Sequence, residues 1–318
     1  MLNEKKLQWV VLGTGGTIAG TAASASDHTG YTAGQLGVQM LLDAVPALHD
    51  VLQGDALLTE QVAQLDSKDM DHATWQALAL RCQHWLARPD VGGIVVTHGT
   101  DTLEESAWFL QQVLDTRKPL VLTCAMRPAT ALTSDGPQNL LDALAVVRDP
   151  QARGVLAVCA GRVHSARDVQ KVHPYRLDAF SSGEAGPLGW VEQGVVRWAK
   201  AADSTDVHPH ARRALAMPAA DWPWVAMLHS HAGADPRQIQ ALVGAGVKGI
   251  VVAGTGNGTV HRELLAALDA AQTQGAAVRL CTRCAEGQLV GQPAALQGAS
   301  PGLNACKARI DLMLELMV

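Results

Sequence analysis

Two short threonine motifs lie far apart in this chain, and each directly follows an apolar run with the character of a buried strand. The first is TGGTIAG at residues 14–20, and the second is THGTDT at residues 97–102. Open α/β sheets keep their chemistry on the loops beyond the carboxyl ends of their strands. Two such loops indicate one site with two hydroxyl-centred catalytic units, which suits attack on an acyl group better than binding of a nucleotide.

The glycines of the first motif admit other interpretations. Gly13, Gly15 and Gly16 follow a strand, as in a dinucleotide-binding turn. The acidic residue expected about twenty residues later would be Asp43, which lies inside a predicted helix, and no Lys follows the glycines as in a phosphate-binding loop. Two interpretations remain: a tight structural turn, or a turn that lets the backbone approach a ligand while Thr17 points its hydroxyl into the site.

Apolar runs and amphipathic segments alternate along the first part of the chain. Continuous β-branched runs between helices are typical of a parallel sheet covered on both faces. The predicted fold class is therefore α/β, with a larger N-terminal domain on a mostly parallel sheet, helices on both its faces, and a smaller C-terminal parallel α/β domain. Strands are predicted at residues 7–12, 56–65, 93–96, 120–124 and 155–159, and helices at 36–45, 69–86, 103–114 and 138–147.

A less regular stretch separates the two predicted domains. Residues 161–195 are expected to form short strands and turns, and residues 200–223 are polar and show no clear periodicity. We therefore expect an N-terminal domain at 1–199, a linker at 200–223 and a C-terminal domain at 224–318, which a chain of 318 residues can accommodate. In the last domain, strands are predicted at 225–228, 249–253 and 277–281, and helices at 236–243, 260–272 and 305–316.

Charge and cysteine content restrict the partners. A net charge of -5 without a basic run argues against nucleic acid and anionic membranes, and no apolar run reaches membrane-spanning length. Cys281 and Cys284 form a CxxC pair without a second pair or neighbouring histidines, so we expect reduced thiols and no zinc site. The first strand is predicted to begin at Leu7, which leaves no room for a signal peptide, and we expect a cytoplasmic protein.

The second threonine motif also has a structural interpretation. Thr100 or Asp101 can cap the helix predicted to begin at Leu103. Capping and catalysis are compatible, because a helix N-terminus also stabilises anions. His98 is a potential general base, but a histidine beside a buried strand is more often a hydrogen-bonded core residue, and we favour that interpretation.

Lys171, in the segment RDVQK, is on its own an ordinary surface lysine. A threonine hydroxyl is too weakly acidic to ionise at pH 7 and needs an adjacent base. A lysine amine can serve where desolvation or nearby positive charge leaves it neutral. A set of Thr100, Lys171 and Asp101 would meet this need, with Asp101 orienting the amine.

Asp66 and Ser67 follow the strand predicted at residues 56–65. Either is a plausible N-cap for the helix predicted to begin at Asp69. The same atoms can bind a ligand carboxylate through a hydroxyl and a backbone N–H. The two interpretations stay open at this point.

Taken in order, seven segments give the chain a resemblance to a known family. It resembles the bacterial-type L-asparaginases, a family of threonine amidohydrolases that includes the glutaminase-asparaginases. The match runs along nearly the whole chain, and it is strongest up to Lys171. The segments are TGGTIAG, GYTAGQLG, LDSKDM, THGTDTLEE, AMRPATALTSDGPQNL, RDVQK and GTGNG.

The resemblance implies a role for the first motif. Thr17 would be the nucleophile that attacks a side-chain amide, giving an acyl-enzyme that water then hydrolyses. Tyr31, on a mobile loop at residues 24–34, would close over the site and assist Thr17. Whether Thr17 or Thr100 makes the first attack stays open.

The resemblance also implies roles around the second motif. Thr100, Asp101 and Lys171 would form a second triad, Ser67 would bind the substrate α-carboxylate, and Asp101 would bind the α-amino group. Backbone N–H groups near Thr100 and Ala125 would stabilise the oxyanion. The predicted catalytic residues are Thr17, Tyr31, Thr100, Asp101 and Lys171, and the predicted substrate-binding residues are Asp66, Ser67, Thr100, Asp101, Ala125 and Asn257.

The family is typically a homotetramer built from dimers, with sites between the first domain of one subunit and the second domain of its neighbour. Its better-known periplasmic members supply a glutamate from the neighbour, but residues 282–287 do not align cleanly with that segment. Glu286, Asn257 and Thr259 are the candidates for this contribution. The Asp66-Ser67 pair looks more like the cytoplasmic members, and no metal or organic cofactor is expected.

The function expected from the resemblance is hydrolysis of L-asparagine to L-aspartate and ammonia, with minor hydrolysis of L-glutamine. The alternative is a non-catalytic amino-acid sensor on the same scaffold, bound to the same class of small molecule. A dinucleotide-dependent enzyme is a more distant third possibility.

Overall fold

A computed structural model describes residues 6–115, 117–202, 207–291, 298–300 and 302–317. The contacts divide the chain into two compact units, Met1–Val207 and His208–Val318. Each unit is an α/β structure with its own sheet, in agreement with the predicted fold class. Among the described residues, no helix is both long enough and apolar enough to cross a membrane.

The larger unit is built on a mixed sheet, which has eight strands within the described residues, in the order β10-β9-β6-β5-β4-β3-β1-β2. The strands from β2 to β5 run parallel, whereas β6, β9 and β10 add antiparallel pairs at the far side. The sheet is therefore mostly parallel, as predicted. The bounds are β1 Gln8–Gly15, β2 Ala56–Leu65, β3 Val91–Thr97, β4 Leu120–Thr123, β5 Val155–Cys159, β6 Arg162–Ser165, β9 Gly189–Glu192 and β10 Val195–Trp198.

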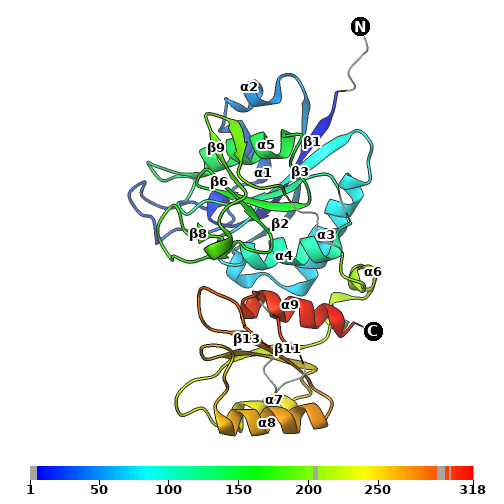
Figure 1. The fold of residues 1–318 in the computed structure, drawn as a ribbon. Helices are drawn as coiled ribbons and strands as arrows, with labels where there is room; N and C mark the ends of the chain where they lie inside the picture. Colours follow the sequence, from blue (N-terminus) through cyan, green and yellow to red (C-terminus); the bar gives the residue numbers. More distant parts are fainter. Residues whose placement is uncertain (1–5, 116, 203–206, 292–297, 301, 318) are drawn as a thin grey trace. The chain divides into compact units, whose positions relative to one another are not determined.

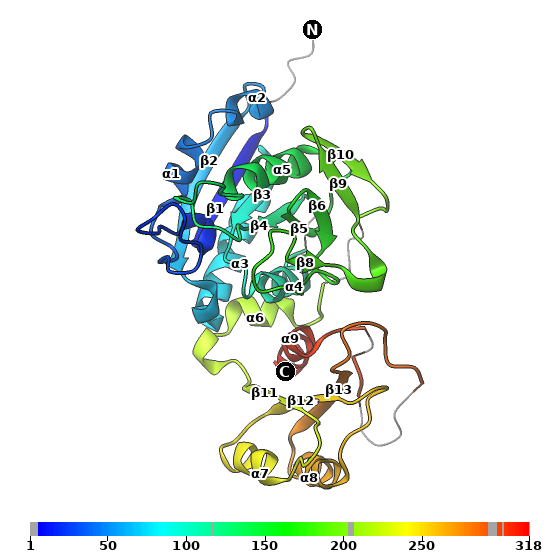
Figure 2. The ribbon, with the colours of Figure 1, turned by 90° about the vertical axis from the view of Figure 1, so that its left-hand side faces the viewer.

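Helices cover both faces of this sheet (Figures 1 and 2). Helix α5 packs on β3, β4 and β5, and it shares one hydrophobic core with α1 and α2. Helices α3 and α4 pack together on the other face of the sheet. The inner strands β3, β4 and β5 are buried on both faces, which explains their continuous apolar runs. The helices are α1 Val38–Asp43, α2 Leu48–Leu52, α3 His72–Leu86, α4 Leu103–Val113 and α5 Gly136–Arg148, and a small hairpin pairs β7 Gln170–Lys171 with β8 Phe180–Ser181.

The register of the sheet aligns the loops that carry the motifs. Gly13 lies beside Thr97, and Thr97 lies beside Thr123, so β1, β3 and β4 end at the same level. The outer strand β2 runs parallel to β1 and reaches the same edge, with Leu65 beside Gly15. The loops after β1, β2, β3 and β4 therefore emerge together, as expected for parallel strands.

The smaller unit has a parallel sheet, three-stranded within its described residues, in the order β11-β12-β13. Helices α7 and α8 share one core with the sheet, and α9 packs on all three strands (Figure 2). This unit agrees with the predicted smaller parallel α/β domain. The bounds are β11 Val225–His229, α7 Arg237–Gly244, β12 Gly249–Gly254, α8 Arg262–Thr273, β13 Ala277–Thr282 and α9 Ala305–Glu315.

The segment predicted to be a linker without periodicity contains a helix. Residues Ala211–Ala216 form α6, and Ala219–Asp221 form a 3-10 turn. A helix of six residues is too short to display a 3.6-residue pattern, which is why the sequence did not reveal it. Residues 203–206 of the predicted linker lie outside the described residues.

Candidate active site

The two threonine motifs touch through two glycines. Gly16 has a φ of 80°, and a Cβ at this position would overlap the backbone of Gly99. A Cβ at Gly99 would in turn overlap the side chain of Ser67. The loops after β1 and β3 are therefore packed backbone against backbone, and the Ser67 side chain from the loop after β2 packs on Gly99, an approach that only glycine permits at these two positions.

Thr17 lies in the first turn after β1 and pairs with Tyr31. The Thr17 Oγ1 is 2.7 Å from the Tyr31 hydroxyl oxygen, and Thr17 is buried. Thr21 and Thr32 exchange two backbone hydrogen bonds that bring the two ends of the intervening loop together. Tyr31, which precedes Thr32, is thereby held next to the first threonine motif. The structure thus joins these two predicted residues, while the mobility of the loop at 24–34 stays a prediction.

Thr100, Asp101 and Lys171 meet at the second motif. The Lys171 Nζ donates to Thr100 Oγ1 at 2.8 Å and to Asp101 Oδ1 at 2.5 Å. The Lys171 side chain is 17% exposed and that of Asp101 is 51% exposed, so the pair opens to solvent at the carboxylate. A hydroxyl, an amine and a carboxylate in mutual contact form a unit able to move a proton to or from the hydroxyl.

A buried carboxylate holds Lys171 in place. Glu104, in the first turn of α4, accepts a 2.6 Å hydrogen bond from the backbone N–H of Lys171. This contact fastens the β7 strand to the helix that begins directly after the second motif. Glu104 is not among the site residues predicted from the sequence, because no local pattern reveals a bond across 67 positions.

Ser67 and Asp66 occupy the turn after β2. Ser67 is buried, its Oγ accepts from the Asp101 N–H at 3.1 Å, and its carbonyl accepts from the Thr102 hydroxyl at 2.8 Å. The Asp66 side chain caps the turn at the Lys68 N–H and forms an ion pair with that lysine. Ser67 therefore belongs to the same loop cluster. Asp66 caps only this 3-10 turn, whereas the helix predicted to begin at Asp69 begins at His72 and is capped by the Asp71 side chain.

His98 is a buried, hydrogen-bonded residue. Burial lowers its pKa to about 4, so the imidazole is neutral at physiological pH. Its Nδ1 is 2.7 Å from the carbonyl oxygen of Gly99 and its Nε2 is 2.8 Å from the Ser106 hydroxyl. The favoured interpretation as a core histidine agrees with this environment.

The loop after β4 brings Ala125 to the first motif. Ala125 is fully buried and packs with Ile18 and Ala19, which directly follow Thr17. Asp135 secures the loop by accepting from the backbone N–H groups of Met126 and Arg127 at 2.9 and 3.0 Å. Ala125 therefore lies beside the turn that carries the predicted nucleophile.

Two family models together account for most of the chain. The model described as Asparaginase, N-terminal, matches residues 9–204, and the model described as Glutaminase/Asparaginase C-terminal domain matches residues 224–317.

The chain belongs to the asparaginase family.

Individual members of the family are similar to this asparaginase over most of its length. It is 38% identical over 311 residues to L-asparaginase 2 of Bacillus subtilis, covering 96% of this chain and 81% of the relative. It is 37% identical over 268 residues to the glutaminase-asparaginase of Pseudomonas fluorescens biotype A, covering 84% and 72%. The crystal structure of a probable cytoplasmic L-asparaginase from Campylobacter jejuni matches with a TM-score of 0.90 at 36% identity, covering 98% of this chain and 95% of that one.

The second-domain candidates of this asparaginase lie in its smaller unit. The Asn257 amide is bonded on both sides to the backbone of Val290, at 2.8 and 2.7 Å. Thr259 bonds Thr255 through hydroxyls and backbone. Glu286 lies exposed after β13. The Asn257 amide thus supports the fold of the Gly-rich turn, and the contribution of these three residues to a site stays a prediction.

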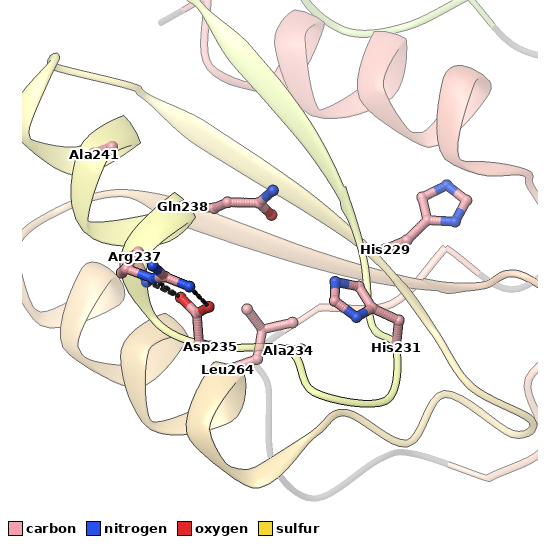
Figure 3. A pocket seen from close by; sticks show the side chains of 8 residues that line it. All are labelled: His229, His231, Ala234, Asp235, Arg237, Gln238, Ala241 and Leu264. Atoms are coloured by element: carbon pink, nitrogen blue, oxygen red, sulfur yellow. Dashed lines mark hydrogen bonds and ion pairs between the residues drawn. The ribbon is translucent and has the colours of Figure 1, made fainter.

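The smaller unit also contains a cavity of about 390 Å³ beside α7 (Figure 3). Asp235 pairs there with Arg237 at 2.6 Å, and this contact lowers the pKa of Asp235 to about 2. The lining includes none of the predicted site residues. It consists of His229, His231, Ala234, Asp235, Arg237, Gln238, Ala241 and Leu264.

Proposed function

We propose that this asparaginase hydrolyses L-asparagine to L-aspartate and ammonia through a threonine nucleophile and an acyl-enzyme, with minor hydrolysis of L-glutamine. The observation that carries the proposal is the pairing of two hydroxyl units on touching loops. One unit is Thr17 with Tyr31, and the other is Thr100 with Lys171 and Asp101. The names of the relatives support the same reaction class.

The proposed reaction has two halves. Thr17 Oγ1 attacks the side-chain amide carbon, and its proton leaves through the Tyr31 oxygen, 2.7 Å away, to reach the departing nitrogen. The carbon–nitrogen bond breaks and ammonia leaves, which gives an ester on Thr17. Water then attacks the ester carbon, the bond from this carbon to Thr17 Oγ1 breaks, and aspartate leaves. Thr100, with Lys171 as a neutral amine, takes up the proton of the water, and a proton returns to Thr17 Oγ1 as it leaves, which restores the free hydroxyl.

Substrate recognition is proposed to use the loops next to these hydroxyls. Ser67, with Asp66 beside it, would bind the α-carboxylate, and Asp101 would bind the α-amino group. The exposed carboxylate of Asp101 supports this role, because it remains open to a ligand. A neighbouring subunit of a cytoplasmic homotetramer would complete the site through Asn257, Thr259 or Glu286.

Ammonia release from a substrate panel tests the proposal. We expect turnover of L-asparagine, and a kcat/KM for L-glutamine lower by about 10- to 200-fold, because one methylene in a pocket is worth about 1–3 kcal/mol. The D-forms serve as stereochemical controls. Binding of L-aspartate without any hydrolysis would instead establish the sensor alternative.

Replacement of Tyr31 by Phe should lower kcat for asparagine by about 100-fold, because the change removes the hydroxyl that exchanges a proton with Thr17. The ring and its packing remain, so KM should change little. The chain contains two tyrosines, and the exposed Tyr175 provides the matched control. Equal kcat values for Tyr31→Phe and Tyr175→Phe would contradict the role of Tyr31.

A further inference from the structure

At two peptide groups of the site, a buried side chain donates a hydrogen bond to the carbonyl oxygen and so clamps its direction. The first joins Gly99 to Thr100, and the second joins Cys124 to Ala125. The described chain contains no cis peptide bond, and in a trans peptide the C=O and N–H point in opposite directions. A side chain that fixes the carbonyl therefore also fixes the direction of the N–H on the next residue.

His98 clamps the first of these carbonyls. A carbonyl can only accept, so His98 Nδ1 carries the proton and donates to the Gly99 oxygen at 2.7 Å. Trp75 donates to the Ser106 hydroxyl at 2.9 Å, which leaves that hydroxyl free to donate to His98 Nε2 at 2.8 Å. This buried relay selects one tautomer of a neutral imidazole and holds it.

Asn139 clamps the second carbonyl. Its Nδ2 donates to the Cys124 oxygen at 2.9 Å, and its Oδ1 accepts from the Ala160 N–H at 2.9 Å. The Ala160 donor fixes which end of the amide is oxygen, because an NH2 group cannot accept from it. Asn139 is buried, and Asp135 accepts a further hydrogen bond from its Nδ2.

The N–H groups on the other side of these two peptides, those of Thr100 and Ala125, donate no hydrogen bond within the described residues. The neighbouring amides are occupied, since Asp101 donates to Ser67 and Met126 donates to Asp135.

Both peptides border the turn that carries Thr17. Gly99 touches Gly16, which precedes Thr17, and Ala125 packs with Ile18, which follows it. The strands β3 and β4, which lead into the two loops, are adjacent and in register.

We infer that His98 and Asn139 are positioning residues that orient the Thr100 and Ala125 N–H groups as the two donors of an oxyanion hole beside Thr17. The inference rests on the proposed function. When Thr17 attacks the amide carbon, the carbonyl oxygen gains negative charge, and donors fixed before the reaction stabilise it without reorganisation. Neither side chain touches the substrate, so each acts through the peptide it holds.

Paired substitutions at each clamp test this inference. His98→Leu removes the donor, whereas His98→Asn keeps an N–H near the Nδ1 position. Asn139→Asp keeps the shape but places a carboxylate against the Cys124 carbonyl. We expect kcat for asparagine to fall by about 10- to 100-fold in His98→Leu and Asn139→Asp. Complete removal of one oxyanion donor lowers kcat by about 10²- to 10³-fold, and a donor that points in the wrong direction should lose part of that effect. We expect His98→Asn to recover most of the kcat.

The ratio of kcat to KM effects separates positioning from general destabilisation. KM for asparagine and the calorimetric affinity for L-aspartate should stay within about threefold of the parent, because the oxyanion forms only in the transition state. His164→Leu removes another buried histidine of the same unit, and Asn304→Asp makes the same chemical change at the N-cap of α9. Both controls should keep the parental kcat, and thermal unfolding will establish that every variant is folded.

The outcomes distinguish this inference from the proposed function. Parental kcat in folded His98→Leu and Asn139→Asp, with an active parent enzyme, would overturn the clamp alone. An equal fall in kcat in the His164→Leu control would also overturn it, because destabilisation would then explain the loss. A parent enzyme that releases no ammonia from any substrate of the panel would overturn the proposed function and this inference together.

Discussion

Replacement of Thr17 by Ala should lower asparagine turnover by about 10⁴-fold or more, the scale of loss seen when an enzyme nucleophile is removed. Thr17 Oγ1 is the hydroxyl that pairs with Tyr31, and Thr17 directly follows Gly16, which packs against Gly99. Alanine keeps the backbone of the turn and removes the attacking atom. Ammonia release by the purified enzyme measures the effect.

The matching Thr100→Ala variant decides which hydroxyl attacks first. If Thr17 attacks, Thr100→Ala should accumulate an aspartyl ester on Thr17, because the unit that activates water has lost its hydroxyl. If Thr100 attacks, the ester should instead be found on Thr100 in Thr17→Ala. Mass spectrometry of proteolytic peptides after rapid quenching with acid distinguishes these outcomes.

A threonine outside both units provides the control. Thr273, in helix α8, uses its hydroxyl for the carbonyl of Asp269, and Thr273→Ala should keep the parental kcat. Normal turnover in both Thr17→Ala and Thr100→Ala would contradict the threonine mechanism as a whole.

The fold was predictable from the sequence where elements are so deeply buried that nearly all their residues are apolar. Strands β3, β4 and β5 of the larger unit are buried on both faces, so they were detectable as continuous apolar runs. Some short helices were not detectable. Helix α2, of five residues, begins two residues after Pro46, at a point where the sequence indicated only the end of a helix. Such elements depend on contacts with the core rather than on a repeating pattern.

Residues that carry chemistry were easier to predict than residues that support them. The sequence indicated Thr17 and Thr100 because each hydroxyl follows a strand within a distinctive motif. The supporting contacts of Glu104, His98 and Asn139 are hydrogen bonds to backbone atoms, which depend on tertiary placement. Glu104 bonds the backbone of a residue 67 positions away, and a sequence without a structure gives no signal for this contact.

Lys171→Met should lower kcat by about 10³-fold, because it removes the amine that exchanges a proton with Thr100 while keeping the length of the side chain. The Lys171 Nζ lies 2.8 Å from Thr100 Oγ1 and 2.5 Å from Asp101 Oδ1. The backbone bond to Glu104 remains in the variant, so β7 should keep its place. Ammonia release and KM for asparagine measure the effect.

Lys171→Arg separates the need for a proton acceptor from the need for positive charge. A guanidinium pairs with Asp101 but stays protonated, so it cannot accept the proton of Thr100 or of water. We therefore expect Lys171→Arg to remain as impaired as Lys171→Met, and Lys248→Met, at an exposed lysine of the smaller unit, to keep the parental kcat. Recovery of kcat by arginine would show that Lys171 acts through its charge alone, and the second hydroxyl unit would then lack its base.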